Sequence, residues 1–248
     1  MRYFIGNWKM FGLPSSISIL NKINSFVKSD KNSKKYRVII TPPYTLLESF
    51  SKSYKYKKIA IGAQNSYYKD MFSSNTGAIS SYMIKNLGSK YIIIGHSDNR
   101  AEGDSDNILK KKVTLALKNN LKVIFCIGEN KNQKKKKQTF KILKKQIKNV
   151  LEKKINQNNV IIAYEPIWSI GTGAIPEAND LIKTSRFIKK VLINVFKSRK
   201  SPPVLYGGSV DSSNVAQFKD IKDVDGFLIG GASKSSKKFI DIIKNYYR

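Results

Sequence analysis

The chain has 248 residues and carries 46 Lys and Arg against 17 Asp and Glu, a formal net charge of +29. This length is enough to bury a full core, so we expect one domain, 1–248. No apolar run is long enough to cross a bilayer and the opening does not read as a signal peptide, which predicts a soluble, cytoplasmic protein without membrane partners. The single Cys126 excludes an intramolecular disulfide and lies in the apolar run VIFCIG, as a buried structural thiol would.

Short apolar runs recur along the chain at intervals of about 30 residues, and each is followed by an amphipathic, lysine-bearing stretch. The runs predict strands at Tyr3 to Trp8, Arg37 to Thr41, Ile59 to Ala63, Tyr91 to Gly95, Lys122 to Ile127, Val160 to Tyr164, Pro203 to Tyr206, and Gly226 to Ile229. The stretches between them predict helices near 16–29, 45–52, 79–87, 106–119, 134–156, 178–198, 213–219 and 236–246. Eight such units predict an α/β fold, a closed (β/α)8 barrel of parallel strands surrounded by helices.

Polar residues stand where several predicted strands end, and in a barrel these ends meet at one mouth. Asn7 and Lys9 are two apart and so share a face of the first strand, while His96 and Glu165 follow the fourth and sixth. A lone His or Glu is more often structural than catalytic, so the joint presence of these residues carries the argument. With one His and no Cys cluster, we expect no metal site.

The stretch from 160 to 173, VIIAYEPIWSIGTG, combines an acid at a strand end with a segment suited to closing over it. We predict that this lid is formed by Pro166, Ile167, Trp168, Gly171, Thr172 and Gly173. Paired-glycine turns follow the last two strands, and exposed backbone N–H groups there are typical of a phosphate site. Together they indicate a small phosphorylated ligand.

These segments place the chain close to a known family. The motifs FIGNWKM, GAQN, IIIGHSD, FCIGE, AYEPIWSIGTG, LYGGSV and LIGGAS, in this order and spacing, resemble the triosephosphate isomerase family from end to end. The resemblance implies a TIM barrel that interconverts dihydroxyacetone phosphate and D-glyceraldehyde 3-phosphate, in glycolysis and gluconeogenesis, without a metal or organic cofactor.

The resemblance also implies the role of each site residue. Glu165 would be the base that moves a proton between two carbons, and His96 a neutral hydrogen-bond donor to the substrate oxygens. Lys9 would supply positive charge and Asn7 would orient the substrate. Asp98 stands where the family usually has Glu, and we expect this shorter side chain to hold a hydrogen bond to Lys9 less well. The implied substrate and phosphate contacts are Asn7, Lys9, Gly171, Ser209, Gly230 and Gly231.

The family resemblance further implies a homodimer in which the loop bearing Thr76 enters the neighbouring subunit. Two positions depart from the family pattern, because Ala78 and Asn99 replace a Glu and an Arg that usually pair across the interface. Losing both leaves no buried charge unpaired, so we still expect association.

Two other interpretations are weighed against this one. A barrel enzyme acting on a larger sugar phosphate or an indole precursor would explain the glycine turns, yet not Asn7, Lys9, His96, Glu165 and the lid together. A basic protein that binds nucleic acid or acidic membranes on a decayed barrel would explain the charge. The lysines, however, are spread through nearly every predicted helix, so we expect a solvated surface and no specific nucleic-acid partner.

Overall fold

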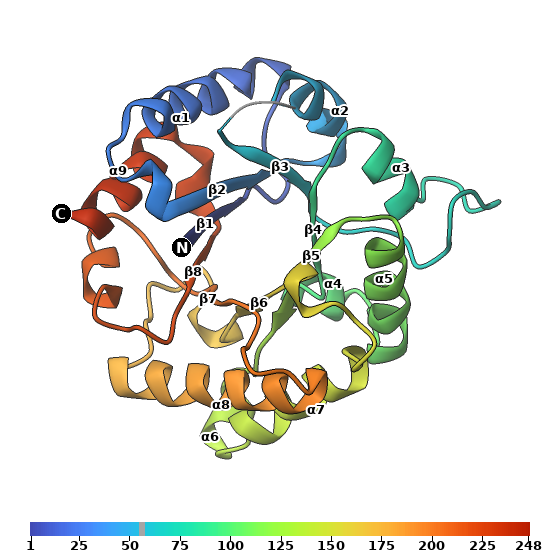
Figure 1. The fold of residues 1–248 in the computed structure, drawn as a ribbon, viewed down its shortest axis with the longest axis vertical. Coiled ribbons are helices and arrows are strands. Elements are labelled where there is room, and N and C mark those ends of the chain that lie inside the picture. Colours follow the sequence, from blue (N-terminus) through green and yellow to red (C-terminus); the bar gives the residue numbers. More distant parts are fainter. Residues whose placement is uncertain (55–57) are drawn as a thin grey trace.

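A computed structural model of the chain describes residues 1–54 and 58–248, and its strands form a closed parallel barrel in the order β1 to β8. The strands lie at the centre of Figure 1 and the helices surround them. The strands are β1 Arg2–Asn7, β2 Tyr36–Thr41, β3 Ala60–Ala63, β4 Tyr91–Ile94, β5 Lys122–Ile127, β6 Val160–Tyr164, β7 Val204–Tyr206 and β8 Gly226–Ile229. The predicted barrel is confirmed, with every strand boundary within one residue of its prediction.

The helices are α1 Ile17–Ser29, α2 Tyr44–Ser53, α3 Ser81–Asn86, α4 Ser97–Ala101, α5 Asp106–Lys118, α6 Lys131–Lys135, α7 Thr139–Val150, α8 Ala178–Phe196 and α9 Ser236–Tyr247. Short 3-10 turns lie at Pro14–Ser16, Ser33–Lys35, Gln157–Asn159, Ile167–Ser169, Val215–Phe218 and Gly231–Lys234. None of the helices within the described ranges is both long and apolar enough to cross a membrane.

Alternation along the strands divides the core into two layers. Ile5, Ile93 and Cys126 belong to a cluster that fills the barrel, whereas neighbours such as Phe4 and Ile92 belong to the cluster between strands and helices. The residues of both layers are buried, which explains why the strands read as continuous apolar runs. Cys126 is fully buried, and burial raises the pKa of its thiol well above the ordinary value, so it is a structural thiol as expected.

One helix prediction is wrong. The single helix expected over 134–156 is two helices, α6 and α7, separated by a turn in which Lys137 has φ of 55°. The second helix ends at Val150, and Leu151 is already extended and buried. A left-handed residue cannot continue an α-helix, and the uniform lysine composition of 134–137 conceals the break from a pattern-based prediction.

The remaining helix predictions are confirmed to within two residues at each end, except that 213–219 is only the 3-10 turn Val215–Phe218. The five-residue helix α4, directly after His96, was not predicted. Its sequence SDNRA has no apolar periodicity that could signal a helix.

The break between α6 and α7 can be tested at Lys137. Because a left-handed lysine is strained and glycine is not, Lys137→Gly should leave the free energy of unfolding unchanged or raise it by up to about 1 kcal/mol. Lys144→Gly, within α7, is the control and should lower it by about 0.5–1 kcal/mol. Urea denaturation measures the free energy of unfolding of both variants. If Lys137→Gly lowered it as much as Lys144→Gly does, the result would favour one continuous helix through position 137.

Candidate active site

Three side chains from different strand ends meet at the mouth of the barrel. Asn7, His96 and Glu165 are 5%, 5% and 3% exposed, and with Lys9 they line a cavity of about 460 Å³. The same cavity is lined by Gly171, Ser209, Gly230 and Gly231. The structure therefore brings all the predicted substrate and phosphate contacts together in one place.

Glu165 directly follows β6 and is held by its backbone, whose N–H donates to the carbonyl of Ile127 at 2.7 Å. Burial raises the pKa of its carboxyl group, and this effect is opposed first by the electrostatic interaction with the adjacent His96 and then by smaller contributions from Cys126 and Lys9. A side chain at Gly207 would crowd it, since a Cβ atom there would lie 2.7 Å from Glu165 Cγ. The site thus holds a desolvated carboxylate, which favours proton uptake.

The protonation of His96 follows from its position at the start of α4. Its Nδ1 accepts a hydrogen bond from the backbone N–H of Asp98 at 3.1 Å, so Nδ1 carries no proton. A neutral imidazole then has its proton on Nε2, which lies 3.3 Å from Glu165 Oε1 at the cavity. The local fold therefore presents a neutral donor beside the carboxylate.

Lys9 adopts a left-handed backbone with φ of 54°, and hydrogen bonds at both its N–H and its carbonyl group stabilise this conformation. Its N–H donates to Asn7 Oδ1 at 3.1 Å, and its carbonyl accepts from Gln64 Nε2 at 2.9 Å. Its Nζ lies 3.1 Å from Asp98 Oδ2. Asp98 was expected to hold this bond less well than the usual Glu, yet the shorter side chain does reach Lys9.

The far end of the lid is fastened through Ser209 and Ser169. Ser209 Oγ accepts from the N–H of Gly173 at 3.1 Å and donates to the carbonyl of Ser169 at 2.7 Å, while Ser169 Oγ lies 2.8 Å from the Tyr206 hydroxyl. Gly171, at the top of the lid, has φ of +69° and lines the cavity. The segment predicted to form the lid is therefore bonded to the turn after β7, and it borders the cavity through Gly171 and Gly173.

The near end of the lid is anchored on Glu129, a residue that the sequence analysis did not single out. Glu129 Oε1 accepts from Trp168 Nε1 at 2.9 Å and from the Tyr164 hydroxyl at 3.2 Å. Lys134 Nζ lies 3.7 Å from the centre of the Trp168 ring. The available signal was the acid at the end of the FCIGE motif, which follows the fifth strand as Glu165 follows the sixth.

A second missed residue is Lys238, an exposed lysine in the first turn of α9 that lines the cavity beside Gly230 and Gly231. Nothing in a lysine-rich sequence distinguishes it from its neighbours. Asp98 lines a smaller adjoining cavity of about 250 Å³. Thr76 lies apart from both cavities, on the loop between β3 and α3 that extends away from the barrel in Figure 1.

Comparisons with known proteins agree with this geometry. The family model for triosephosphate isomerase matches residues 2–246. Triosephosphate isomerase of Zygosaccharomyces bailii is 37% identical over 248 residues, which cover 98% of each chain, and that of Bradyrhizobium sp. (strain ORS 278) is 37% identical with 96% and 95% covered. The crystal structure of triosephosphate isomerase from Bartonella henselae matches with a TM-score of 0.89 at 31% identity, covering 100% of this chain and 99% of that one.

The raised pKa of Glu165 has a testable effect on stability. The unfolded chain ionises this carboxyl group at its ordinary pKa of 4.5, whereas the folded chain resists ionisation until the higher, folded pKa. The burial cost of the charge therefore appears as the pH rises above 4.5. Glu165→Gln removes that cost, so its advantage over the parent in unfolding free energy should grow with pH.

Urea denaturation of both proteins between about pH 4 and about pH 8 measures this difference. A difference that stays constant or shrinks as the pH rises would contradict a raised pKa at Glu165.

Proposed function

The chain belongs to the triosephosphate isomerase family, and we propose that it interconverts dihydroxyacetone phosphate and D-glyceraldehyde 3-phosphate as one catalytic domain spanning 1–248. The observation that carries this proposal is the pair formed by the buried Glu165 carboxylate and the neutral His96 at 3.3 Å, inside a cavity walled by glycine turns. A weak carbon acid needs both a base and a donor at the same point, and this pair offers both.

In the proposed reaction Glu165 removes a proton from carbon 1 of dihydroxyacetone phosphate. The electrons of the broken C–H bond form the carbon–carbon double bond of an enediolate, and the carbonyl oxygen takes up the negative charge. A proton passes from the hydroxyl group on carbon 1 to the oxygen on carbon 2, and Glu165 then returns its proton to carbon 2 as the carbonyl group forms on carbon 1. The raised pKa of Glu165 supports this role, because a desolvated carboxylate is a stronger base than one in water.

His96 Nε2 and the Lys9 ammonium would stabilise the charge that develops on the substrate oxygens. The hydrogen bond at Nδ1 fixes the tautomer that can donate, and the bond to Asp98 directs the Lys9 side chain. Both groups are in place before the substrate enters, so little reorganisation accompanies the reaction.

The closed lid and the glycine turns would hold the phosphate and exclude water. Gly171, Ser209, Gly230 and Gly231 border the same cavity, and backbone N–H groups of the three glycines would donate to the phosphate. Water near an enediolate phosphate promotes loss of the phosphate group, so the hydrogen bonds that close the lid would also protect the intermediate.

We further propose that the protein acts in the cytoplasm, where glycolysis supplies its substrate, and that it forms a homodimer. Exposed apolar side chains on and near the extended loop support the dimer. Phe72, Met71 and Met83 line one groove at this loop and are 75%, 45% and 40% exposed. Large apolar side chains clustered in this way are typical of a surface that a partner covers.

The isomerase activity can be tested directly with the Glu165→Gln variant. Loss of the base should lower turnover of glyceraldehyde 3-phosphate by about 10²–10⁴-fold in a coupled assay, while inorganic phosphate still binds. The exposed Lys190→Gln should retain parental turnover. A folded but inactive parent, or near-normal turnover by Glu165→Gln, would overturn the proposal.

The proposed dimer can be tested by sedimentation equilibrium of a loop variant. Phe72→Glu places a charge within the proposed interface and should shift the protein from dimer to monomer. Phe140→Glu is the matched control, because Phe140 is also an exposed aromatic residue, at 44%, but lies on α7. A monomeric parent, or equal effects of the two variants, would argue against this interface.

A further inference from the structure

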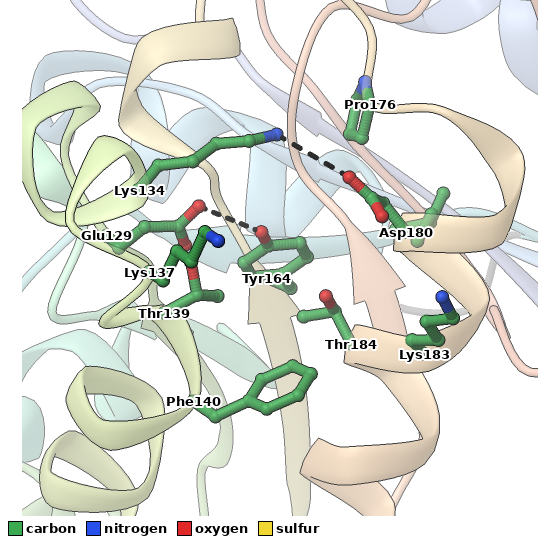
Figure 2. A pocket seen from close by; sticks show the side chains of 11 residues that line it. Glu129, Lys134, Lys137, Thr139, Phe140, Tyr164, Pro176, Asp180, Lys183 and Thr184 are labelled. Carbon is green, nitrogen blue, oxygen red and sulfur yellow. Dashed lines mark hydrogen bonds and ion pairs between the residues drawn. The ribbon is translucent and has the colours of Figure 1, made fainter.

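A second cavity, of about 300 Å³, lies on the outer side of the barrel behind the lid anchor (Figure 2). Its walls come from Glu129 after β5, from Tyr164 at the end of β6, from the α6 and α7 segment, from Pro176 and from α8. It shares no lining residue with the active-site cavity. Residues at its inner end, Glu129 and Tyr164, are nevertheless those that hold the lid at Trp168.

Glu129, which lines this cavity, carries an unsatisfied acceptor. Glu129 is 1% exposed, and its Oε1 accepts two hydrogen bonds, while its Oε2 is buried and has no partner among residues 1–54 and 58–248. Burial raises the pKa of this carboxyl group, against the two donors and Lys134. A buried carboxylate oxygen without a donor is costly, so a group that donates to it would bind favourably.

The rest of the cavity is lined by apolar side chains and by exposed lysines. Phe140 and Leu181 give it apolar walls, as Figure 2 shows for the Phe140 ring. Lys137 and Lys183 line it as exposed residues, and neither makes an ion pair within the part of the chain that the structure describes. The third lysine, Lys134, is engaged, since its Nζ lies 4.0 Å from Asp180 and over the Trp168 ring.

We propose that this cavity binds a small organic anion that carries a hydroxyl group. The hydroxyl donates to Glu129 Oε2, the carbon skeleton packs between Phe140 and Leu181, and the anionic group pairs with Lys137 and Lys183. The ligand enters past the two exposed lysine side chains, which are free to move aside. A cavity of this volume, mostly apolar with a few polar groups, is of the size that holds small ligands.

Occupancy of this cavity should also be linked to lid closure, a consequence that rests on the proposed function. The ligand stabilises the charged form of Glu129, which is the form that accepts most strongly from Trp168. By linkage, a ligand that favours the closed lid must raise the affinity for the triose phosphate. The expected sign is a lower KM.

The binding claim is tested by calorimetric titration of the full-length protein with 4-hydroxybenzoate, which has a hydroxyl, an apolar ring and a carboxylate. Benzoate, which lacks only the hydroxyl, should bind at least about tenfold more weakly. Equal binding of the two compounds, or no binding of 4-hydroxybenzoate, would overturn the proposal.

Variants locate the site. The double variant Lys137→Asn and Lys183→Gln should lose about tenfold or more in affinity for 4-hydroxybenzoate. The control is the double variant Lys197→Asn and Lys190→Gln, which removes the same number of positive charges from the surface elsewhere. Lys197, like Lys137, has a left-handed backbone, with φ of 50°, so the two substitutions to Asn are matched in backbone conformation. Equal losses in the two double variants would show an effect of net charge alone, and would refute the site.

Two further measurements separate this cavity from the active site. Lys9→Met, which removes the cation of the active-site cavity, should bind 4-hydroxybenzoate as the parent does, and a loss of binding would place the compound in the active site. In the coupled assay, 4-hydroxybenzoate should lower KM, and a KM that does not fall would refute the link to the lid. The titration does not depend on turnover, so its failure is distinguishable from failure of the proposed isomerase.

Discussion

The buried carboxylate of Glu165 is the group on which the rest of the site depends. A carboxylate removed from water must be balanced by nearby donors or cations, or it remains protonated and cannot act as a base. Here the balance is partial, because His96 and Lys9 oppose the burial without cancelling it. The backbone must also close tightly around the acid, since a Cβ atom at Gly128 would lie 1.8 Å from the carbonyl oxygen of Glu165. Only a glycine at position 128 therefore lets the backbone that carries the acid pass this close to the end of β5.

A second acid, Glu129, is also buried, and its carboxylate is hydrogen-bonded to Trp168 of the proposed lid. Glu165 and Glu129 follow adjacent strands, β6 and β5, and both are buried with raised pKa values. They differ in what surrounds them, since Glu165 faces the cavity and a histidine, whereas Glu129 is held by Trp168 and Tyr164. One carboxylate thus borders the cavity, where we propose that it transfers protons, and the other is bonded to the segment that we propose as a lid. Environment, and not residue type, separates their roles.

The sequence was sufficient to predict the barrel and the meeting of Asn7, His96 and Glu165, because alternation and strand-end position are local properties that the fold preserves. It could not indicate the turn at Lys137, since four consecutive lysines carry no pattern from which a break can be read. Nor could it predict that Asp98 reaches Lys9, because that distance depends on the left-handed backbone of Lys9 and on the position of α4. Such details arise from packing between segments far apart in the chain.

The net charge of +29 does not by itself identify a polyanion-binding protein. The buried Lys112 is paired with an acid, since its Nζ lies 2.7 Å from Asp104. Outside the active-site cavity the excess positive charge lies on the surface, where salt at physiological concentration screens electrostatic fields within about 8 Å. Surface lysines can therefore hasten the encounter with an anionic substrate, but they act too weakly over distance to take part in proton transfer. Lys9, held at the mouth by its backbone and by Asp98, is the cation to which we assign the stabilising role in the proposed reaction.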